Sequence, residues 1–446
     1  RRSRKKGENM PSDTPSKVTS STAGTDDATR STNQAQLESR EVRSHFGPTE
    51  MVILQGTTQC NINCRYCYLS EKSRRSRQVM TIANLRTIFD NLFSTGRFGR
   101  QLVICWHSGE PLMLPPSYYD EAIGAISDLR DHYIPELQLR FDVQTNAIPI
   151  NEKWCEFFQR HAECFEIGVS CDGPAAIHDA NRLSWSEEPT HEKVVRGIER
   201  LAGAGVQFNM IAVVANRSLD HADDIYDFAV RYIDSLSDFH FNLLDTPASQ
   251  IVSIEGSAAA QSAASEYLIR YRRFLQRLLE RTRQDVLEGR RPLPIRNFRH
   301  IYTRVLGSAE EQNELSMRSM ARPMKTLSVE ADGRTTAFYA GLTSSDYTSL
   351  YGDDCGLVVG NLLSDSVTTI AASPKLLAIA TDFEVSHRAC ESGCDYASLC
   401  SGGFNLTKKV RFGTFEATET PECVAHVKTL VDEVLADLQR HADSVS

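Results

Sequence analysis

Three cysteines stand close together in the stretch Thr58-Gln59-Cys60-Asn61-Ile62-Asn63-Cys64-Arg65-Tyr66-Cys67-Tyr68, with the spacing C-x3-C-x2-C. Three thiolates at this spacing suit a four-iron cluster in which one iron has no protein ligand. Electron carriers of the ferredoxin type give every iron a cysteine, because they only pass electrons. An iron left open offers a place for a substrate or cofactor, by the same logic that separates catalytic from structural zinc sites. The stretch therefore predicts a catalytic iron–sulfur centre.

Two simpler uses of these cysteines fit the pattern less well. A structural zinc site needs a fourth Cys or His ligand nearby, and none follows Cys67 closely. A disulfide would leave one of the three thiols unpaired. Because further motifs follow downstream in a consistent order, we interpret the three thiols as cluster ligands.

The composition narrows the class of protein. The chain has 446 residues, 41% of them hydrophobic, and a formal net charge of −9. This length predicts two or three domains at roughly 100–200 residues each, and the negative charge argues against a nucleic-acid surface. No apolar run reaches the ~18 residues of a membrane span, and no signal peptide is evident. Twelve cysteines without an export signal favour metal ligands over disulfides. We therefore expect a cytoplasmic protein that binds neither nucleic acid nor membrane.

Six apolar runs predict buried strands, and segments of helical period separate them. The runs are Val52–Leu54, Leu102–Trp106, Leu139–Val143, Phe165–Val169, Phe208–Val214 and Phe239–Leu244. A long last helix is expected over Ala264–Arg283. Six strand–helix units in series favour a parallel sheet with right-handed crossovers. We expect an α/β fold, a partial (βα)6 TIM-like barrel open on one side, whose working residues gather at the carboxyl ends of the strands.

Polar motifs follow three of these strands. Trp106-His107-Ser108-Gly109-Glu110-Pro111 follows the second strand, Val143-Gln144-Thr145-Asn146 ends the third, and Val169-Ser170-Cys171-Asp172-Gly173-Pro174 ends the fourth. Together with the cysteine triad, the motifs resemble those of the radical SAM enzymes, with Ser108 in place of the first glycine of the family's Gly-Gly-Glu-Pro motif. The resemblance implies that the open iron chelates S-adenosylmethionine and that a 5′-deoxyadenosyl radical abstracts hydrogen from the substrate.

The resemblance also implies roles for individual residues. Cys60, Cys64 and Cys67 would hold the cluster, Tyr66 would pack against adenine, and Glu110 would accept a hydrogen bond from the cofactor's amino group. Arg182, in the pattern His178-Asp179-Ala180-Asn181-Arg182, would anchor a carboxylate or pair with Asp179. The full set implied in binding the cofactor is Tyr66, Ser108, Gly109, Glu110, Asn146, Ser170 and Arg182.

A second cysteine set stands near the end of the sequence. Cys390, Cys394 and Cys400 follow the spacing C-x3-C-x5-C, and Cys423 adds a fourth thiolate. Zinc ribbons prefer paired C-x2-C knuckles, so the spacing fits them poorly. Beside a radical SAM core, the set resembles the SPASM extension of peptide-maturing enzymes. The resemblance implies one auxiliary [4Fe–4S] cluster on these four cysteines, with Cys355 unligated.

We expect four parts in the chain. Residues 1–48 are predicted to be a disordered arm, because this polar segment cannot bury enough apolar surface to offset the entropy of ordering. The radical SAM partial barrel is expected over 49–290, a connecting segment over 291–325, and the cysteine-rich SPASM domain over 326–446. Four further cysteines lack metal-ligand spacing and are assigned to packing, namely Cys105, Cys155, Cys164 and Cys171.

Several short motifs resemble one subgroup, the cyclophane-forming radical SAM/SPASM maturases of ribosomally made peptides. The motifs are Phe241-Asn242, Gly360-Asn361 and Phe415-Glu416-Ala417-Thr418-Glu419-Thr420, together with a lack of cysteine over 327–338. This resemblance implies hydrogen abstraction from a side-chain Cβ of a precursor peptide and bond formation to an aromatic ring. An electron donor such as flavodoxin or ferredoxin is implied as a partner.

Alternatives to this function stay open at this point. A sulfatase-maturase-like enzyme would oxidise Ser or Cys to formylglycine but normally keeps two auxiliary clusters. A thioether-forming maturase would need cysteines in its substrate, and a redox or cluster-binding protein would not cleave the cofactor. No general base is identified, since Glu391 and Asp395 beside the second cysteine set are equally available.

Overall fold

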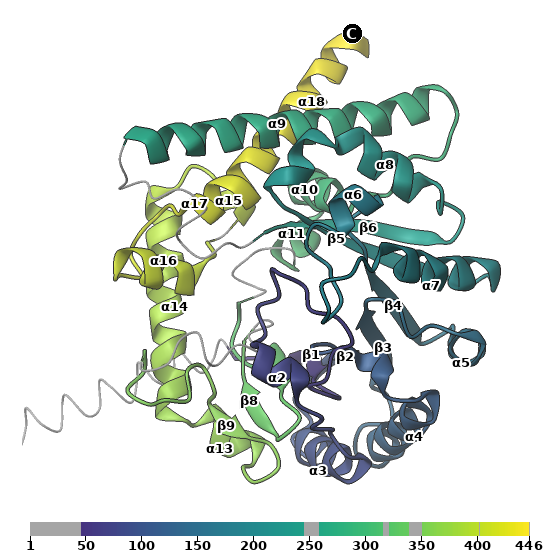
Figure 1. Cartoon of the computed structure of the whole chain (residues 1–446). Helices are drawn as coiled ribbons and strands as arrows, with labels where there is room; N and C mark the ends of the chain where they lie inside the picture. Colours follow the sequence, from purple (N-terminus) through teal and green to yellow (C-terminus); the bar gives the residue numbers. More distant parts are fainter. Residues whose placement is uncertain (1–45, 245–257, 315–320, 339–349, 401, 446) are drawn as a thin grey trace, which may run out of the picture. The chain divides into compact units, whose positions relative to one another are not determined.

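The structure is a computed structural model that describes residues 46–244, 258–314, 321–338, 350–400 and 402–445 (Figure 1). The described residues belong to one unit, His45–Ser446. Most of the arm expected over residues 1–48 lies outside the described residues. Phe46 and Gly47, at the end of this segment, are described: Phe46 is buried, and Gly47 N donates to Pro323 O. Among the described residues, no helix is long and apolar enough to cross a membrane.

Nine strands of the described chain form one sheet in the order β6-β5-β4-β3-β2-β1-β7-β8-β9. All six predicted strands are confirmed, and each pairs in parallel with the next along the chain. The sheet does not close, because β6 and β9 stand at its two ends, as expected for a partial barrel. The strands are β1 (Thr49–Leu54), β2 (Phe98–Trp106), β3 (Gln138–Thr145), β4 (Phe165–Ser170), β5 (Phe208–Val214), β6 (Leu236–Leu243), β7 (Thr326–Val329), β8 (Arg334–Thr336) and β9 (Gly360–Asn361).

The last three strands extend the sheet in a way that the sequence did not predict. Strand β7 pairs in parallel with β1, and β8 and β9 continue antiparallel. Asn91, on the helix between β1 and β2, donates to Leu362 O and Asp365 O and accepts from Val367 N. The sheet therefore runs without a break across residue 326, where a domain boundary was expected. Pairing with β7 also satisfies the backbone groups of β1, which would otherwise form an open edge.

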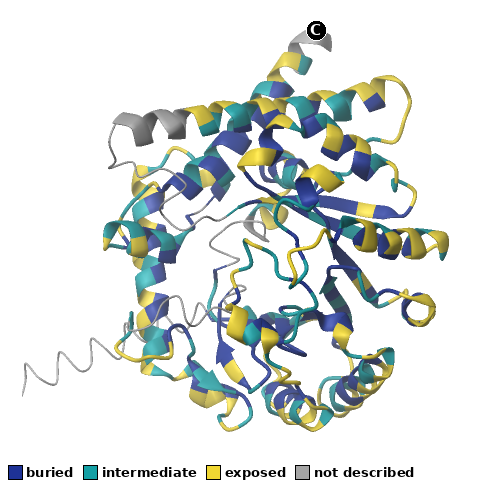
Figure 2. Ribbon diagram, viewed as in Figure 1, coloured by how far each residue is buried: buried dark blue, intermediate teal, exposed yellow. Residues whose placement is uncertain are grey.

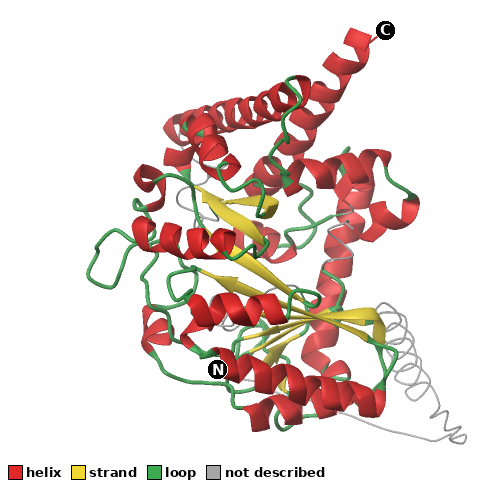
Figure 3. Ribbon diagram, turned by 90° about the vertical axis from the view of Figure 1, so that its right-hand side faces the viewer, coloured by secondary structure: helices red, strands yellow, loops and turns green. Residues whose placement is uncertain are grey.

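Helices connect the parallel strands and pack on the sheet (Figure 3). Helix α9 packs against α8, and α18 packs against α9 in turn (Figure 1). The helices are α2 (Glu71–Arg75), α3 (Ile82–Phe93), η1 (Pro111–Met113), α4 (Pro116–Tyr133), α5 (Glu152–Arg160), α6 (Ala175–His178), α7 (His191–Gly203), η2 (Asn216–Asp220), α8 (Ala222–Val230), α9 (Ala258–Leu287), α10 (Arg296–Leu306), α11 (Ala309–Glu314), α13 (Val367–Ala371), α14 (Pro374–Gly393), α15 (Ala397–Cys400), α16 (Asn405–Phe412), α17 (Pro421–Cys423), η4 (Val424–Thr429) and α18 (Leu430–Val445).

The core lies between the strands and these helices (Figure 2). Alternate residues of a strand point to opposite faces, and those facing the helices are apolar and buried. Trp106 at the end of β2 stacks on Phe141 and Phe165 of the neighbouring strands and meets the edge of Tyr119 from α4. This aromatic cluster packs the end of β2, which carries the first polar motif, against β3, β4 and α4.

Helix α7 packs so closely on the loop after β3 that one position requires glycine. A Cβ built on Gly197 would lie 2.1 Å from Ala147 O, whereas a Cβ on Gly203 of the same helix meets no atom within 4 Å.

We predict that Gly197→Ala lowers the free energy of unfolding by about 1–3 kcal/mol, because a backbone oxygen must move. Gly203→Ala is the matched control and should be neutral or stabilise by up to ~1 kcal/mol. Urea unfolding followed by circular dichroism measures both. Equal effects of the two substitutions would contradict the packing described.

Candidate functional site

The loop that carries the first three cysteines is fixed between two polar motifs. Glu110 N donates to Gln59 O (2.7 Å) on one side of the loop. On the other side, Asn63 N donates to Leu183 O (2.7 Å) and Arg65 N donates to Asn181 O (2.8 Å). The tertiary structure therefore brings the triad together with the segments around Glu110 and Arg182, as expected. The triad consists of Cys60, Cys64 and Cys67, all partly buried.

The contact between this loop and the end of β2 needs a glycine. Gly109 has φ +68°, and a Cβ there would lie 2.5 Å from Thr57 O and 2.8 Å from Gln59 O. Ser108, where the family has its first glycine, also has a positive φ of 74°. Such a conformation is uncommon for residues other than glycine. The Ser108 hydroxyl lies 3.1 Å from the Tyr68 hydroxyl, which holds the strained residue against the cysteine loop.

Glu110 joins the ends of β2 and β3. Its carboxylate accepts hydrogen bonds from Leu112 N (3.0 Å), Thr145 Oγ1 (2.7 Å) and Asn146 N (2.7 Å), and the residue is 1% exposed. Burial raises the pKa of Glu110 to about 7, while these three hydrogen bonds act in the opposite direction. Asn146 Nδ2 continues the network to Asn61 of the cysteine loop (2.7 Å). Glu110 thus has a structural task that the sequence did not predict, and its contact with a cofactor amino group stays a prediction.

Arg182 pairs with Asp172, so the alternative pairing with Asp179 is wrong. Arg182 Nε donates to Asp172 Oδ1 (3.1 Å), the Tyr66 hydroxyl donates to Asp172 Oδ2 (2.5 Å), and the Arg182 guanidinium lies 5.4 Å from the Tyr66 ring centroid. Asp179 instead accepts from Thr190 N and His191 N, because these N–H groups at the start of α7 lack helical partners. Sequence reasoning assigned no role to Asp172, which is 1% exposed and holds Tyr66 and Arg182 together.

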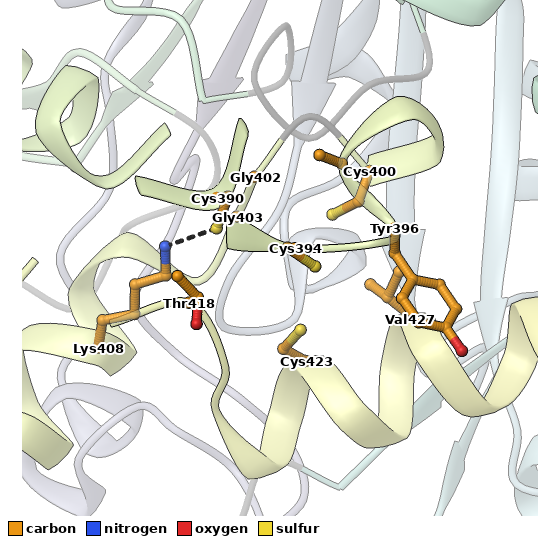
Figure 4. Close-up of a pocket in the computed structure, with 11 residues that line it drawn as sticks. Cys390, Cys394, Tyr396, Cys400, Gly402, Gly403, Lys408, Thr418, Cys423 and Val427 are labelled. Atoms are coloured by element: carbon orange, nitrogen blue, oxygen red, sulfur yellow. Dashed lines mark hydrogen bonds between the residues drawn. The ribbon is translucent and has the colours of Figure 1, made fainter. Parts of the chain in front are cut away.

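The second cysteine set converges on one pocket (Figure 4). Cys390 lies in the last turn of α14, Cys394 follows that helix, Cys400 ends α15 and Cys423 ends α17. The Thr420 hydroxyl accepts from Cys423 N, and Thr418 lines the pocket, so the motif before the last cysteine serves the same site.

Both cysteine sets have the chemistry of a four-iron cluster. Within the described part of the chain, no three His, Cys, Asp or Glu side chains are close enough to hold a single metal ion. A four-iron cluster places each thiolate on a different iron, and four thiols around one pocket supply the ligands that such a cluster needs. Burial raises the pKa of Cys60 and of Cys423 to about 12. A metal ion or cluster would bind these cysteines as thiolates and release their protons.

Comparison with known proteins decides the family. Residues 54–229 match the model of the radical SAM superfamily. An uncharacterized protein of Synechocystis sp. is 31% identical over 415 residues, which cover 91% of this chain and 97% of that protein. The chain belongs to the radical SAM superfamily. It is therefore an enzyme, and the family implies S-adenosylmethionine and a [4Fe–4S] cluster as its cofactors.

Other known proteins are similar to this chain over part of its sequence or in fold alone. The serine-type anaerobic sulfatase-maturating enzyme of Bacteroides thetaiotaomicron is 33% identical over 173 residues, which span 38% of this chain and 40% of that enzyme. The structure of anSMEcpe with bound AdoMet and a Cp18Cys peptide has a TM-score of 0.65 at 20% identity and covers 90% of this chain and 100% of that one. Streptococcus suis SuiB bound to the precursor peptide SuiA has a TM-score of 0.56 at 12% identity, covering 88% and 80%.

The barrel interior of this radical SAM enzyme carries charged side chains that sequence reasoning missed. Asp142 of β3 stands in register with Glu166 of β4, and burial together with Glu166 raises the pKa of Asp142 to about 7. Asp238 of β6 accepts from Arg296 (2.5 Å) and Arg299 (2.8 Å) of α10. The sequence does contain a signal for these side chains, since each aspartate interrupts an apolar strand segment with a charge.

The remaining residues singled out in the sequence lie outside the hydrogen-bond networks described above. Cys355 is exposed and does not line the four-cysteine pocket. Glu391 and Asp395, the two carboxylates considered as bases, are exposed and do not line it either. Ser170 ends β4 and is half-buried. No role of these residues is assigned by the geometry.

We predict that Glu110→Gln lowers the free energy of unfolding of the apoprotein by about 1–3 kcal/mol. An amide offers one acceptor oxygen and a donor in place of two acceptor oxygens, so at least one N–H or O–H donor loses its partner. Anaerobic urea unfolding measures the change, and slower formation of 5′-deoxyadenosine should accompany it. Glu136→Gln, in the exposed loop before β3, is the control and should change neither quantity.

Proposed function

We propose that this radical SAM enzyme modifies a ribosomally made precursor peptide by joining a side-chain Cβ to an aromatic ring. The observation that carries the proposal is the cysteine content: one triad, one set of four around a single pocket, and an exposed Cys355. Enzymes of the sulfatase-maturase type normally keep two auxiliary clusters. The strands β7 and β8 occupy the segment where further ligands would stand, and they contain no cysteine.

A peptide substrate is supported by the relatives. The names of the partial sequence relatives describe sulfatase-maturating enzymes, and two structures of similar fold contain bound peptides. We propose that the substrate enters the open side of the sheet, where the barrel interior meets the cysteine loop. The electron donor, such as flavodoxin or ferredoxin, is part of the same proposal.

In this proposal, the residues around the triad position the cofactors and shield the radical from solvent. When bound, the cluster of the triad and S-adenosylmethionine supply a 5′-deoxyadenosyl radical that removes a hydrogen atom from a C–H bond. Glu110 and Gly109 hold the cysteine loop on the strand ends. Tyr66 and Arg182, which both donate to Asp172, are proposed to contact adenine and a carboxylate group. Ser108, Asn146 and Ser170 complete the proposed cofactor site.

The proposed crosslink leaves one proton and one electron to be removed. The peptide first gives a hydrogen atom to the deoxyadenosyl radical, and the carbon radical then bonds to the ring. The ring becomes aromatic again by releasing a proton and an electron. We propose that Cys390, Cys394, Cys400 and Cys423 bind an auxiliary [4Fe–4S] cluster that accepts this electron, within a SPASM domain over residues 326–446. Asp142, with its raised pKa, is available as a proton acceptor.

Iron analysis tests the two-cluster arrangement. We predict about eight irons per chain after anaerobic reconstitution, and about four in Cys60→Ala/Cys64→Ala/Cys67→Ala, which should no longer form 5′-deoxyadenosine. Cys390→Ala/Cys394→Ala/Cys400→Ala/Cys423→Ala should also retain about four irons but still cleave the cofactor. About four irons with bound zinc in the wild type would contradict the auxiliary cluster, and about twelve would favour two auxiliary clusters.

Formylglycine formation is the second candidate, because a partial relative at 33% identity is named a sulfatase-maturating enzyme. A precursor peptide with ring-deuterated aromatic residues separates the two reactions. We predict that the product loses one ring deuterium and one hydrogen, as shown by mass spectrometry, and that a hydrazide probe does not label it. Full retention of ring deuterium together with hydrazide labelling would establish an aldehyde product. Ring deuterium retained without labelling, in a cysteine-containing peptide, would indicate a thioether.

A further inference from the structure

A buried lysine donates a hydrogen bond to one ligand of the second cysteine set. Lys408 lies on α16 and is 1% exposed. Its Nζ lies 2.9 Å from Cys390 Sγ, 2.8 Å from Ser386 Oγ and 3.1 Å from Ser386 O. Figure 4 shows the ammonium pointing at the Cys390 sulfur from the edge of the pocket. The three N–H groups of this lysine are thus used, one of them on the sulfur.

The surroundings of Lys408 point to a negatively charged group in the pocket. Lysine is almost never fully buried without a charge partner, and leaving its charge unpaired in the interior is costly. Its hydrogen-bond partners among the described residues include no carboxylate; they are a serine and a cysteine. Among these partners, Cys390 is the one that can become an anion, because a cysteine binds a metal cluster as a thiolate.

Other cations lie near the same pocket. Arg304 of α10 is buried within electrostatic range of Cys400. Lys428 of η4 also interacts electrostatically with Cys394 and Cys423, but its Nζ donates to the Glu419 carboxylate. Of these three cations, Lys408 is the one for which a hydrogen bond to a cysteine sulfur is described.

The cations near the first cysteine set, Arg74 and Arg182, interact electrostatically with Cys64 but have oxygen atoms as hydrogen-bond acceptors. Arg74 donates to Leu69 O and to Asn63 Oδ1, and Arg182 donates to Asp172. The hydrogen bonds described for these buried arginines thus end on oxygen atoms and not on the sulfurs of the triad.

We infer that Lys408 raises the reduction potential of the auxiliary cluster, an inference that rests on the proposed cluster at Cys390, Cys394, Cys400 and Cys423. Reduction adds a negative charge to a cluster and its ligands. A nearby cation and an N–H donor to a ligand sulfur stabilise that charge, and both raise the potential. A higher potential suits a cluster that accepts an electron, whereas the triad's cluster must be a strong reductant. Lys408 acts through Cys390 as a positioning and tuning residue and does not touch the substrate.

The test is an anaerobic redox titration followed by electron paramagnetic resonance. The parent protein is Cys60→Ala/Cys64→Ala/Cys67→Ala, so that the auxiliary cluster alone gives the signal. Lys408→Met, which removes charge and donor, should shift the midpoint potential to a more negative value. Lys408→Gln, which keeps a donor without the charge, should give a smaller negative shift, and Lys408→Arg should restore the parent value. Lys409→Met is the matched control, since Lys409 Nζ donates to Gly413 O at the surface, and should leave the potential unchanged.

The outcomes distinguish failure of the inference about Lys408 from failure of the proposed auxiliary cluster. A parent that binds about four irons, with the same potential in Lys408→Met, overturns the inference alone. If Lys408→Met fails to assemble its cluster, the comparison of Lys408→Gln with Lys408→Arg decides, and equal potentials overturn the inference. A parent without iron overturns the auxiliary cluster and the role of Lys408 together.

Discussion

The site depends on the close fit of the cysteine loop onto the ends of β2 and β3. This fit has no room for a side chain at Gly109, where a Cβ would meet two carbonyl oxygens. The buried Glu110 carboxylate then joins both strand ends, and Asn146 extends the network to Asn61 between the first two cysteines. A cluster site needs its thiolates held in one arrangement, and here rigid strands and backbone hydrogen bonds provide that support.

The extension of the sheet links the two cysteine sets through the fold. Strand β1 leads into the loop of the triad, and its other edge pairs with β7, the first strand of the segment that leads to the second set. The side chain of Asn91 adds hydrogen bonds between α3 and the turn before α13. The part of the chain expected to be a separate domain is therefore built directly on the barrel sheet, which fixes its start relative to the triad.

Each of the two cysteine sets has buried charged side chains close to it. Asp172 neutralises Arg182 next to the triad, whereas Lys408 directs its charge at Cys390 itself. Because burial of an ion is costly unless a partner compensates it, these positions mark where the fold supports chemistry. Arg182 thus donates to a carboxylate and Lys408 to a cysteine sulfur, and this difference in acceptor is the basis of the inference drawn for Lys408.

The sequence by itself determined the six parallel strands, the cysteine triad and the second set of four. These features depend on local periodicity and spacing, which a chain displays without its fold. Only the tertiary structure decided that Arg182 pairs with Asp172 and not with Asp179, that β7 joins β1, and that Lys408 reaches Cys390. Partners such as Thr145 for Glu110 or Ser386 for Lys408 lie tens of residues away in the chain or on other elements. Packing alone brings them within hydrogen-bonding distance, because no local pattern records which buried polar groups will meet.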